Sequence, residues 1–360
     1  MAKPIIIDGN FCCRNLTGVE RYAFEICANL DPLIQKDQIW LYVPANAKHI
    51  PTYQNIKVVR SKKDCTCFPV WDHIIFSHFV GKNHGIALNF GNLTPWLHPG
   101  IVFIHDIYSV LHPEDFTGRR DKLVNLYDRM MYHHAAKRGK LVVTVSNYSR
   151  ETISKQYHLP SESIAVIPNG WDHFKAILPD GGIFTRFPSI KPHAYYFTLG
   201  SLSKRKNLKW IAEYAEKHQD QQFVISGKAI SGLVPDALKA LQKLPNVVLA
   251  GYLSDGEVKA LMQESKAFVF PSYFEGFGIP PLEALSCGAK IIVAKASCLP
   301  EIYGNCAHYI DPDNTNVDLD ALLEEHVDEP TRILERYTYA NGARKFFRLL
   351  LAKQLLGRRQ

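Results

Sequence analysis

The sequence predicts an α/β fold made of two doubly wound parallel sheets, and three observations support this prediction. Short continuous apolar runs such as 4–8 ("PIIID") are typical of strands buried on both faces of a parallel sheet. They alternate with segments such as 19–30, whose apolar residues recur at helical spacing. The alternation stops at 176–192, a stretch with proline and glycine but little periodicity, and then starts again. A chain of 360 residues therefore suits two domains of this class.

Strand and helix patterns follow one another in both halves of the chain. In the first half we expect strands at 4–8, 39–44, 56–60, 86–90, 101–106 and 141–146, and helices at 19–30 and 119–138. In the second half we expect strands at 195–201, 222–228, 247–253, 267–272, 289–295 and 307–312, and helices at 207–218, 236–244 and 256–265. Ligands of open parallel sheets bind outside the carboxyl ends of the strands, so we expect the site in the loops that follow the strands.

Composition and charge narrow the class of protein further. Hydrophobic residues make up 46% of the chain and charged residues 21%, as in an ordinary globular protein. The net charge of +7 favours an anionic ligand or surface, but no aromatic stripe indicates RNA binding, so no nucleic-acid partner is expected. Neither a membrane-spanning run nor a signal peptide is apparent, so we expect a cytoplasmic protein. The eight cysteines lack zinc-site spacing and are interpreted as reduced thiols.

The stretch 267–285 ("AFVFPSYFEGFGIPPLEAL") combines a buried-strand pattern with glycines, prolines and two carboxylates. We expect the strand to end near Phe270 and a helix to begin at Pro280 or Pro281, because proline is tolerated in the first helical turn. Gly276 and Gly278 allow a sharp turn and bring a ligand close to backbone N–H groups at the helix start. The stretch therefore predicts an anion site with carboxylates directed into one crevice.

This stretch resembles the E-x7-E signature of the retaining nucleotide-sugar glycosyltransferases of family 4, which have the GT-B fold. Other segments resemble the same family in the same order along the chain: "LTGVERYAFEI", "FIHDIYSVLHPEDF", "VTVSNYSRETI", "IAVIPNGWD", "GSLSKRKNL" and "ASCLPEIYGNCAHYIDP". The resemblance covers nearly the whole chain. It implies two Rossmann-like domains facing across a cleft, with a C-terminal helix that crosses back to the N-terminal domain.

The resemblance implies roles in donor binding for the residues of the motif. Glu283 is expected to accept hydrogen bonds from the ribose hydroxyls. Its alternative role is a favourable charge interaction with the dipole of the helix in whose first turn it lies. Glu275 is expected to contact the donor sugar ring. Four loop residues are expected to hold sugar hydroxyls or phosphate oxygens through their backbone: Gly276, Phe277, Gly278 and Ile279.

Basic residues after the strand at 195–201 match the loop of the family that binds the diphosphate. Arg205 and Lys206 are expected to stabilise the negative charge that develops on the leaving nucleoside diphosphate. The alternative is a solvated charge run ahead of a helix. Some family members carry an arginine where this chain has Ser201, a position in the donor-binding loop, and this departure leaves Arg205 and Lys206 with more of the diphosphate charge.

Further site residues implied by the resemblance come from both halves of the chain. His105 matches a histidine near the sugar and the acceptor, and a purely structural histidine is the alternative. Gly18 matches a loop glycine that faces the diphosphate, and the preceding Thr17 is also a candidate helix N-cap. Tyr252 falls where the family binds the nucleobase, and core packing is its alternative.

Taken with the resemblance, these residues predict a retaining hexosyltransferase. It moves a hexose, with mannose mildly preferred, from a GDP- or UDP-linked sugar to a glycan or lipid-linked acceptor in O-antigen or other cell-surface polysaccharide synthesis. No second pair of carboxylates suggests a covalent nucleophile, so we favour front-face transfer. No cofactor and no metal are expected.

Three other classes of protein were weighed. A dehydrogenase is disfavoured because the first strand is not followed by G-x-G-x-x-G. A GT-B sugar-nucleotide epimerase or a phosphorylase-like enzyme shares the two-domain architecture and stays open. A catalytically idle nucleotide-sugar-binding protein also stays open, although both glutamates and both basic residues are present.

The expected domains are an acceptor-binding domain at 1–175, a linker at 176–192 and a nucleotide-sugar-binding domain at 193–335. Residues 336–360 form the C-terminal helix. Its segment "ARKFFRLLLAKQLLGRR" is basic and apolar at helical spacing, which suits either packing on the N-terminal domain or contact with an anionic membrane. The resemblance favours packing. Peripheral association with the inner face of the plasma membrane is left open.

Overall fold

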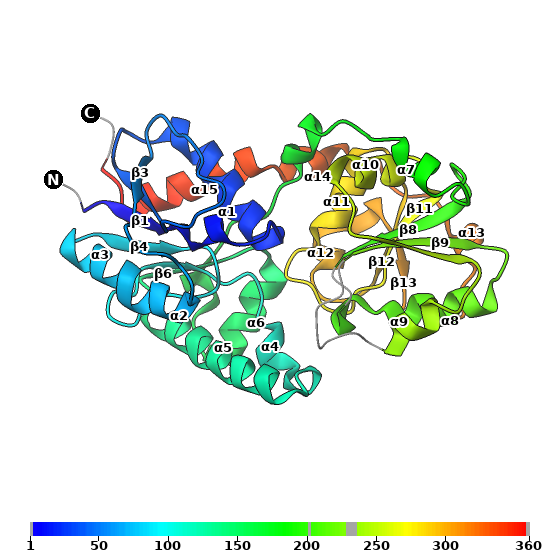
Figure 1. The fold of residues 1–360 in the computed structure, drawn as a ribbon, viewed down its shortest axis with the longest axis horizontal. Helices are drawn as coiled ribbons and strands as arrows, with labels where there is room; N and C mark the ends of the chain where they lie inside the picture. The colour runs from blue at the N-terminus through cyan, green and yellow to red at the C-terminus, as the bar shows by residue number, and fades with distance from the viewer. Residues whose placement is uncertain (1–2, 201–202, 228–235, 358–360) are drawn as a thin grey trace. The chain divides into compact units, whose positions relative to one another are not determined.

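The computed structural model describes residues 3–200, 203–227 and 236–357, which form two compact units. The division falls between Gly170 and Trp171, and again between Arg336 and Tyr337, so that the C-terminal segment returns to the first unit. Unit 1 is the N-terminal unit with this returning segment, and unit 2 comprises Trp171–Arg336. Each unit contains one parallel sheet covered by helices (Figure 1). The predicted fold of two doubly wound sheets is confirmed.

Unit 1 has a sheet of order β3-β2-β1-β4-β5-β6-β7 in which all neighbouring strands are parallel. The strands are β1 (Ile5–Asp8), β2 (Ile39–Val43), β3 (Lys57–Arg60), β4 (Ile86–Asn89), β5 (Ile101–Phe103), β6 (Leu141–Thr144) and β7 (Ile164–Val166). The α-helices are α1 (Gly18–Leu30), α2 (Phe68–Val70), α3 (Ser77–Lys82), α4 (Tyr108–Leu111), α5 (Arg119–Arg138), α6 (Asn147–Tyr157) and α15 (Tyr339–Ala352). A π-helix, η3 (Trp71–Phe76), joins α2 to α3.

Unit 2 has a parallel sheet of order β10-β9-β8-β11-β12-β13. Its strands are β8 (Tyr195–Leu199), β9 (Gln222–Ser226), β10 (Val247–Gly251), β11 (Ala267–Phe270), β12 (Ile291–Ala294) and β13 (His308–Ile310). Its α-helices are α7 (Gly182–Arg186), α8 (Leu208–Lys217), α9 (Asp236–Leu241), α10 (Asp255–Gln263), α11 (Ile279–Ser286), α12 (Leu299–Tyr303), α13 (Leu319–Leu322) and α14 (Thr331–Arg336). The strand order reverses between β8 and β11, which is where an open sheet forms a ligand crevice.

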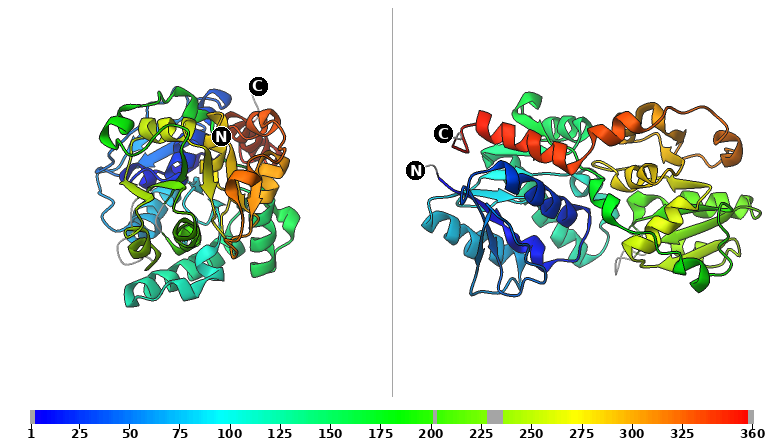
Figure 2. Two further views of the ribbon diagram at one scale, coloured as in Figure 1. Left: turned by 90° about the vertical axis from the view of Figure 1, so that its right-hand side faces the viewer. Right: turned by 90° about the horizontal axis from the view of Figure 1, so that it is seen from above.

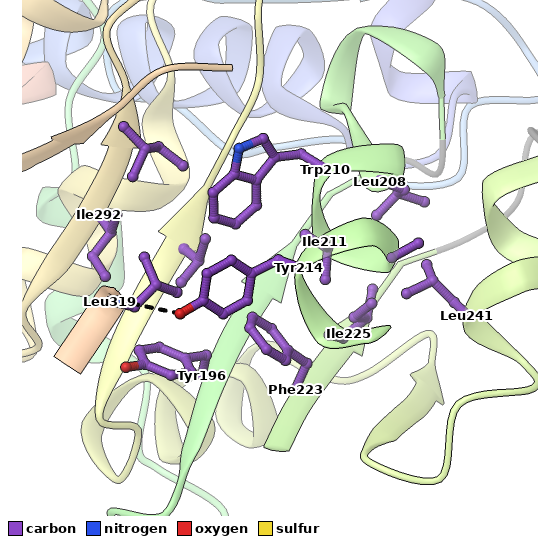
Figure 3. Close-up of a cluster of buried hydrophobic side chains, with 14 of the residues drawn as sticks. Tyr196, Leu208, Trp210, Ile211, Tyr214, Phe223, Ile225, Leu241, Ile292 and Leu319 are labelled. Carbon is purple, nitrogen blue, oxygen red and sulfur yellow. Dashed lines mark hydrogen bonds between the residues drawn. The ribbon is translucent and has the colours of Figure 1, made fainter. Parts of the chain in front are cut away.

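A buried aromatic cluster fixes α8 against the sheet of unit 2 (Figure 3). Trp210 and Tyr214 of α8 stack with ring centroids 5.1 Å apart, and Tyr214 packs edge-on against Phe223 of β9. The Trp210 indole donates to the carbonyls of Asp311 and Asn314, at 3.1 and 3.0 Å. Because α8 begins at Leu208, this packing also fixes the loop that carries Arg205 and Lys206.

The region expected to be a linker belongs to unit 2. It contains α7 and is held by α10: the Lys259 ammonium donates to the carbonyls of Phe174 and Ile177, and the Asp180 N–H donates to the Gly256 carbonyl. Low periodicity in 176–192 therefore reflects short elements tied down by hydrogen bonds. The strand β7 was not predicted, because its three residues are too short to show a pattern.

The C-terminal helix α15 packs on α1 in unit 1, as predicted (Figure 2). Tyr339 meets Tyr22 of α1 with ring centroids 6.0 Å apart, and Phe346 meets Phe103 of β5 at 5.2 Å. These apolar residues of α15 are buried, so its apolar side is used for core packing. In the described residues, no helix is both long and apolar enough to span a membrane.

Phe346→Ala is expected to destabilise unit 1 by about 3–5 kcal/mol, because it leaves a cavity beside Phe103 at a fully buried position. Urea unfolding followed by tryptophan fluorescence measures the loss. Arg344→Ala, on the exposed side of the same helix, is the matched control and should change stability by less than about 0.5 kcal/mol. Equal stability of the two variants would contradict the packing of α15.

Candidate functional site

The carboxyl ends of β8, β9 and β11 form a small pocket in unit 2. The pocket lies where the strand order of the sheet reverses. Residues from the three strand ends and the following loop line it, among them Thr198, Ser226, Phe270 and Lys206. The Lys206 ammonium lies 4.6 Å from the centre of the Phe270 ring, a cation–π geometry. The predicted basic loop therefore meets the end of β11 at the expected edge of the sheet.

Glu275 joins Arg205 and Lys206 in one cluster. The Lys206 ammonium donates to Glu275 Oε1 at 2.6 Å, and Arg205 Nη1 donates to Glu275 Oε2 at 3.0 Å. The Glu275 N–H donates to the Ser297 hydroxyl at 3.1 Å, which anchors the loop from the other side. Glu275 of the motif thus contacts both residues of the predicted basic loop, 70 and 69 positions earlier in the sequence.

Charge balance keeps the Glu275 carboxyl ionised. Burial alone would raise the pKa of Glu275, but Lys206 and Arg205 outweigh it and hold that pKa below its usual value. One buried carboxylate against two cations leaves the cluster with a net charge of +1. Such a cluster suits an anionic group that approaches the pocket from solvent.

A glycine turn connects β11 to α11. Gly278 has φ +80° and is the N-cap of α11, and a Cβ at this position would lie 2.7 Å from Leu299 Cδ2. The left-handed backbone favours glycine, and a Cβ here would also force the end of the Leu299 side chain to move. The helix begins at Ile279, one residue before the predicted start, so both prolines lie in its first turn. The Tyr303 hydroxyl donates to the Gly278 carbonyl and holds the turn from α12.

Glu283 faces a histidine that the sequence did not indicate. It is the fifth residue of α11 and is 8% exposed, and its Oε1 lies 3.1 Å from Nε2 of the buried His173. His173 follows the segment "NGWD", which looks like a turn, and lies 110 positions before its partner. Only the fold brings the two side chains together.

One predicted donor-binding residue, Tyr252, lies apart from this cluster. Tyr252 directly follows β10, the edge strand that β9 separates from β8, and its side chain is 79% exposed. The alternative of core packing for Tyr252 is therefore excluded, while the structure gives it no contact with Glu275 or Glu283. Ser201 lies outside the described residues. Gly276 and Phe277 are buried within the loop between β11 and α11.

His105, in unit 1, follows β5 and is 8% exposed. Its Nε2 lies 2.8 Å from the Phe90 carbonyl, which can only accept, so Nε2 carries the hydrogen and Nδ1 is the acceptor nitrogen. Burial lowers the pKa of His105, although the Phe90 carbonyl, Asp106 and Glu20 act in the opposite direction. The imidazole is therefore neutral near pH 7. The Asp106 carboxylate accepts the Tyr108 N–H.

Gly18 is the first residue of α1. The preceding Thr17 is the N-cap and forms a capping box with Glu20, whose carboxylate accepts the Thr17 N–H at 3.2 Å and the Thr17 hydroxyl. The expected capping role of Thr17 is thus confirmed. This cap places Gly18 at the N-terminus of α1, where backbone N–H groups favour an anion.

The solved structures that the chain resembles include glycosyltransferases and a sucrose-phosphate synthase. The chain is similar to WaaG, a glycosyltransferase involved in lipopolysaccharide biosynthesis, at 16% identity and a TM-score of 0.63, covering 96% of this chain and 95% of that one. It is also similar to HepE from Anabaena, solved with UDP and glucose, at 16% identity and a TM-score of 0.63, covering 99% of both chains. These similarities assign the fold to the GT-B class.

Models of protein families assign the chain to a sequence family within this fold class. Residues 16–173 match the model "Glycosyltransferase Family 4", and residues 184–342 match "Glycosyl transferases group 1". Together these two models cover most of both units. The chain belongs to this family of glycosyltransferases.

Curated relatives include transferases of different sugars. The O-antigen chain mannosyltransferase RfbU of Salmonella typhimurium is 24% identical over 316 residues, which is 83% of this chain and 84% of that protein. The serotype-specific mannosyltransferase WbdA of Escherichia coli is 23% identical over 322 residues, but the chain spans only 38% of its length. A galactosyltransferase of Escherichia coli that uses UDP-Gal and a diphosphoundecaprenol-linked acceptor is 27% identical over 199 residues, or 52% of this chain.

Proposed function

We propose that this glycosyltransferase is a retaining, metal-independent hexosyltransferase that moves mannose from a nucleoside-diphosphate sugar to a lipid-linked glycan of a cell-surface polysaccharide. The observation that carries the proposal is the cluster of Arg205, Lys206 and Glu275 at the carboxyl ends of β8 and β11. The net cationic cluster suits the diphosphate of the donor. Mannose is favoured because several similar proteins are mannosyltransferases, and the similar UDP-Gal enzyme keeps UDP-linked donors as the competing class.

The proposed chemistry relies on fixed charge. As the glycosidic bond breaks, negative charge grows on the leaving diphosphate, and Arg205 and Lys206 stabilise it most in the transition state. These cations supply charge that a divalent metal supplies in other transferases, which supports metal independence. No step of the proposal needs a cofactor.

Retention is proposed to occur by front-face transfer. Both carboxylate oxygens of Glu275 are engaged by cations, and its lowered pKa makes it a weak base, so Glu275 is poorly suited to be a covalent nucleophile. Glu275 acts instead as a positioning residue for Lys206 and Arg205 and contacts the donor sugar from its loop. The departing phosphate oxygen then takes the acceptor proton. His105 Nδ1 is the acceptor nitrogen of unit 1 available to hold a sugar hydroxyl.

The family resemblance also assigns further residues to the donor. Glu283 accepts from the ribose hydroxyls, and Tyr252, exposed at the end of β10, contacts the nucleobase. The family resemblance assigns Ser201, which lies outside the described residues, and Gly276, Phe277, Gly278 and Ile279 to the sugar and phosphate groups of the donor. It also assigns the backbone of Gly18, at the start of α1, to the diphosphate. A lipid-linked acceptor implies a cytoplasmic protein at the inner face of the plasma membrane.

Thermal unfolding with GDP, UDP, dTDP, ADP and their sugar conjugates tests the proposal, with and without magnesium. A ligand that binds only the folded protein at 100 times its Kd stabilises it by about 2.7 kcal/mol. We expect one nucleotide family to raise the Tm equally in both conditions. The anomeric configuration of the product, read by NMR, then tests retention. No shift with any donor would contradict the proposed donor site. A shift without transfer to any acceptor would favour an idle binder, and release of nucleoside diphosphate without any acceptor would favour an epimerase.

A further inference from the structure

Large apolar side chains are exposed on one part of unit 1. They come from α2 and η3, from the loop after β4 and from α5, and we call this set the α5 surface: Val70, Ile74, Trp96, Leu97, Leu123, Leu126 and Met130. Leu123 is 69% exposed, Leu126 63% and Leu97 79%. Exposed apolar residues that stand alone are ordinary, but a contiguous group marks a binding surface.

Ring contacts join the three segments of the α5 surface into one area. His73 of η3 hydrogen-bonds the Tyr127 hydroxyl of α5 at 2.8 Å. Trp96 lies against His134 of α5, with ring centroids 4.3 Å apart, and 6.2 Å from the ring of His73. Leu123 and Met130 lie one helical turn from Tyr127 on α5, Val70 lies one turn from His73, and Leu97 follows Trp96. The three segments that carry the exposed apolar residues therefore adjoin one another.

The spacing along α5 places this apolar stripe on the solvent side of the helix. Leu123, Leu126 and Met130 are three and four positions apart, so they share one face. Asn125, Met131 and Tyr132 point inward and are buried. The core of unit 1 thus uses a different face of α5, which leaves the stripe for a partner. Figure 1 draws α5 along the outer edge of unit 1, next to α2.

Basic side chains surround the stripe. The helix α5 carries six Lys and Arg against two Asp, a net charge of +4. All six cations are exposed: Arg119, Arg120, Lys122, Arg129, Lys137 and Arg138. Arg119 and Lys137 lie on the same face of α5 as the apolar stripe, one at each end of it. Arg119 is four positions before Leu123, and Lys137 is seven positions after Met130. An apolar strip with a cationic border complements a surface whose interior is apolar and whose rim is anionic.

We propose that the α5 surface docks the protein on an anionic lipid bilayer, with its apolar side chains in the interfacial layer and its cations at the headgroups. Leucine, methionine and tryptophan suit the acyl boundary, and each Lys or Arg near an anionic leaflet adds to binding. The other basic amphipathic candidate, α15, has its apolar side buried in unit 1. This inference rests on the proposed lipid-linked acceptor and deepens it by identifying the docking surface.

Flotation of the full chain with vesicles tests the proposal. The vesicles contain phosphatidylcholine alone or phosphatidylcholine mixed with phosphatidylglycerol. We expect binding to the mixed vesicles only, weakened by salt. The variant Leu123→Ser/Leu126→Ser/Met130→Ser should lower the partition coefficient by about tenfold or more, and Lys122→Ala/Arg129→Ala should lower it only on the anionic vesicles. Because these side chains are exposed, the Tm should not fall.

Matched controls separate the α5 surface from general effects. Leu178→Ser removes an 83% exposed leucine of unit 2, and Arg344→Ala/Arg348→Ala removes exposed cations of α15. Both should bind vesicles as the unchanged protein does. Failure of the unchanged protein to bind anionic vesicles, or equal binding by the triple-serine variant, would overturn the proposal.

Measurements of the oligomeric state and of sugar transfer distinguish membrane docking from dimer formation and from failure of the proposed function. A dimer in sedimentation equilibrium that the triple-serine variant abolishes would assign the surface to a second copy of this chain instead. Sugar transfer to a water-soluble acceptor is measured separately and should be unchanged in the triple-serine variant. Transfer by an unchanged protein that does not bind anionic vesicles would refute only the docking surface, whereas vesicle binding without transfer to any acceptor would refute only the proposed function.

Discussion

Lys206→Ala is expected to lower kcat by about 100- to 1,000-fold with little change in the overall fold, because the missing ammonium no longer stabilises the leaving diphosphate. The ammonium bonds Glu275 at 2.6 Å and lies against the Phe270 ring, and these two contacts hold the cation in place. Such a preorganised charge acts on the transition state without reorganisation. Steady-state kinetics with the donor found in the thermal panel measure the effect.

The control for this prediction lies three residues further along the chain. Lys209 is 78% exposed and pairs along its own helix with Glu213, so Lys209→Ala should keep normal turnover. Lys206→Ala also leaves Glu275 with Arg205 alone, and the Tm of each variant shows whether loss of stability contributes. Lys206→Arg keeps the charge and should recover part of the rate. A folded Lys206→Ala variant with normal kcat would mean that the basic run is only a solvated face of the loop.

The fold was predictable because both sheets follow simple local rules. Strands such as β1 and β11 are buried on both faces, and continuous apolar runs reveal such strands directly. Errors are concentrated where elements are short. β5 ends at Phe103, although the apolar run continues further, because the chain leaves the sheet to form the His105 loop. The π-helix η3 and the hydrogen-bonded segment before β8 carry no periodic signal.

The contacts of the site depend on the fold more than on local sequence. Motif residues placed Glu275 and Lys206 in neighbouring loops, but nothing local indicated that they bond each other. His173 beside Glu283 is a second contact of this kind. In unit 1, Asp8 of β1 and Asp72 of η3 bring their carboxyl groups together in the buried interior, where burial raises the pKa of both. A single sequence gives no signal for such pairs over long separations.

Glu283→Gln is expected to weaken binding of the nucleotide-sugar by about 10- to 100-fold, because two ribose hydroxyls lose a charged acceptor. The amide has the same shape as the carboxylate, so α11 and its packing should be unaffected. Isothermal titration with the preferred donor measures the change in Kd. Glu213→Gln, on an exposed face of α8, is the matched control and should bind normally. A normal Kd for Glu283→Gln would remove Glu283 from the donor site and leave it as a partner of His173.

His173 allows the role of Glu283 to be tested a second way. If His173 acts by holding the Glu283 carboxylate, 3.1 Å away, then His173→Ala should also weaken donor binding, though less than Glu283→Gln. Adding His173→Ala to the Glu283→Gln variant should then cost little more, because the interaction it supports is already gone. Such a double-mutant cycle has a coupling free energy clearly different from zero. Additive losses in Kd would instead mean that His173 contacts the donor independently, or supports the loop before α7 without acting through Glu283.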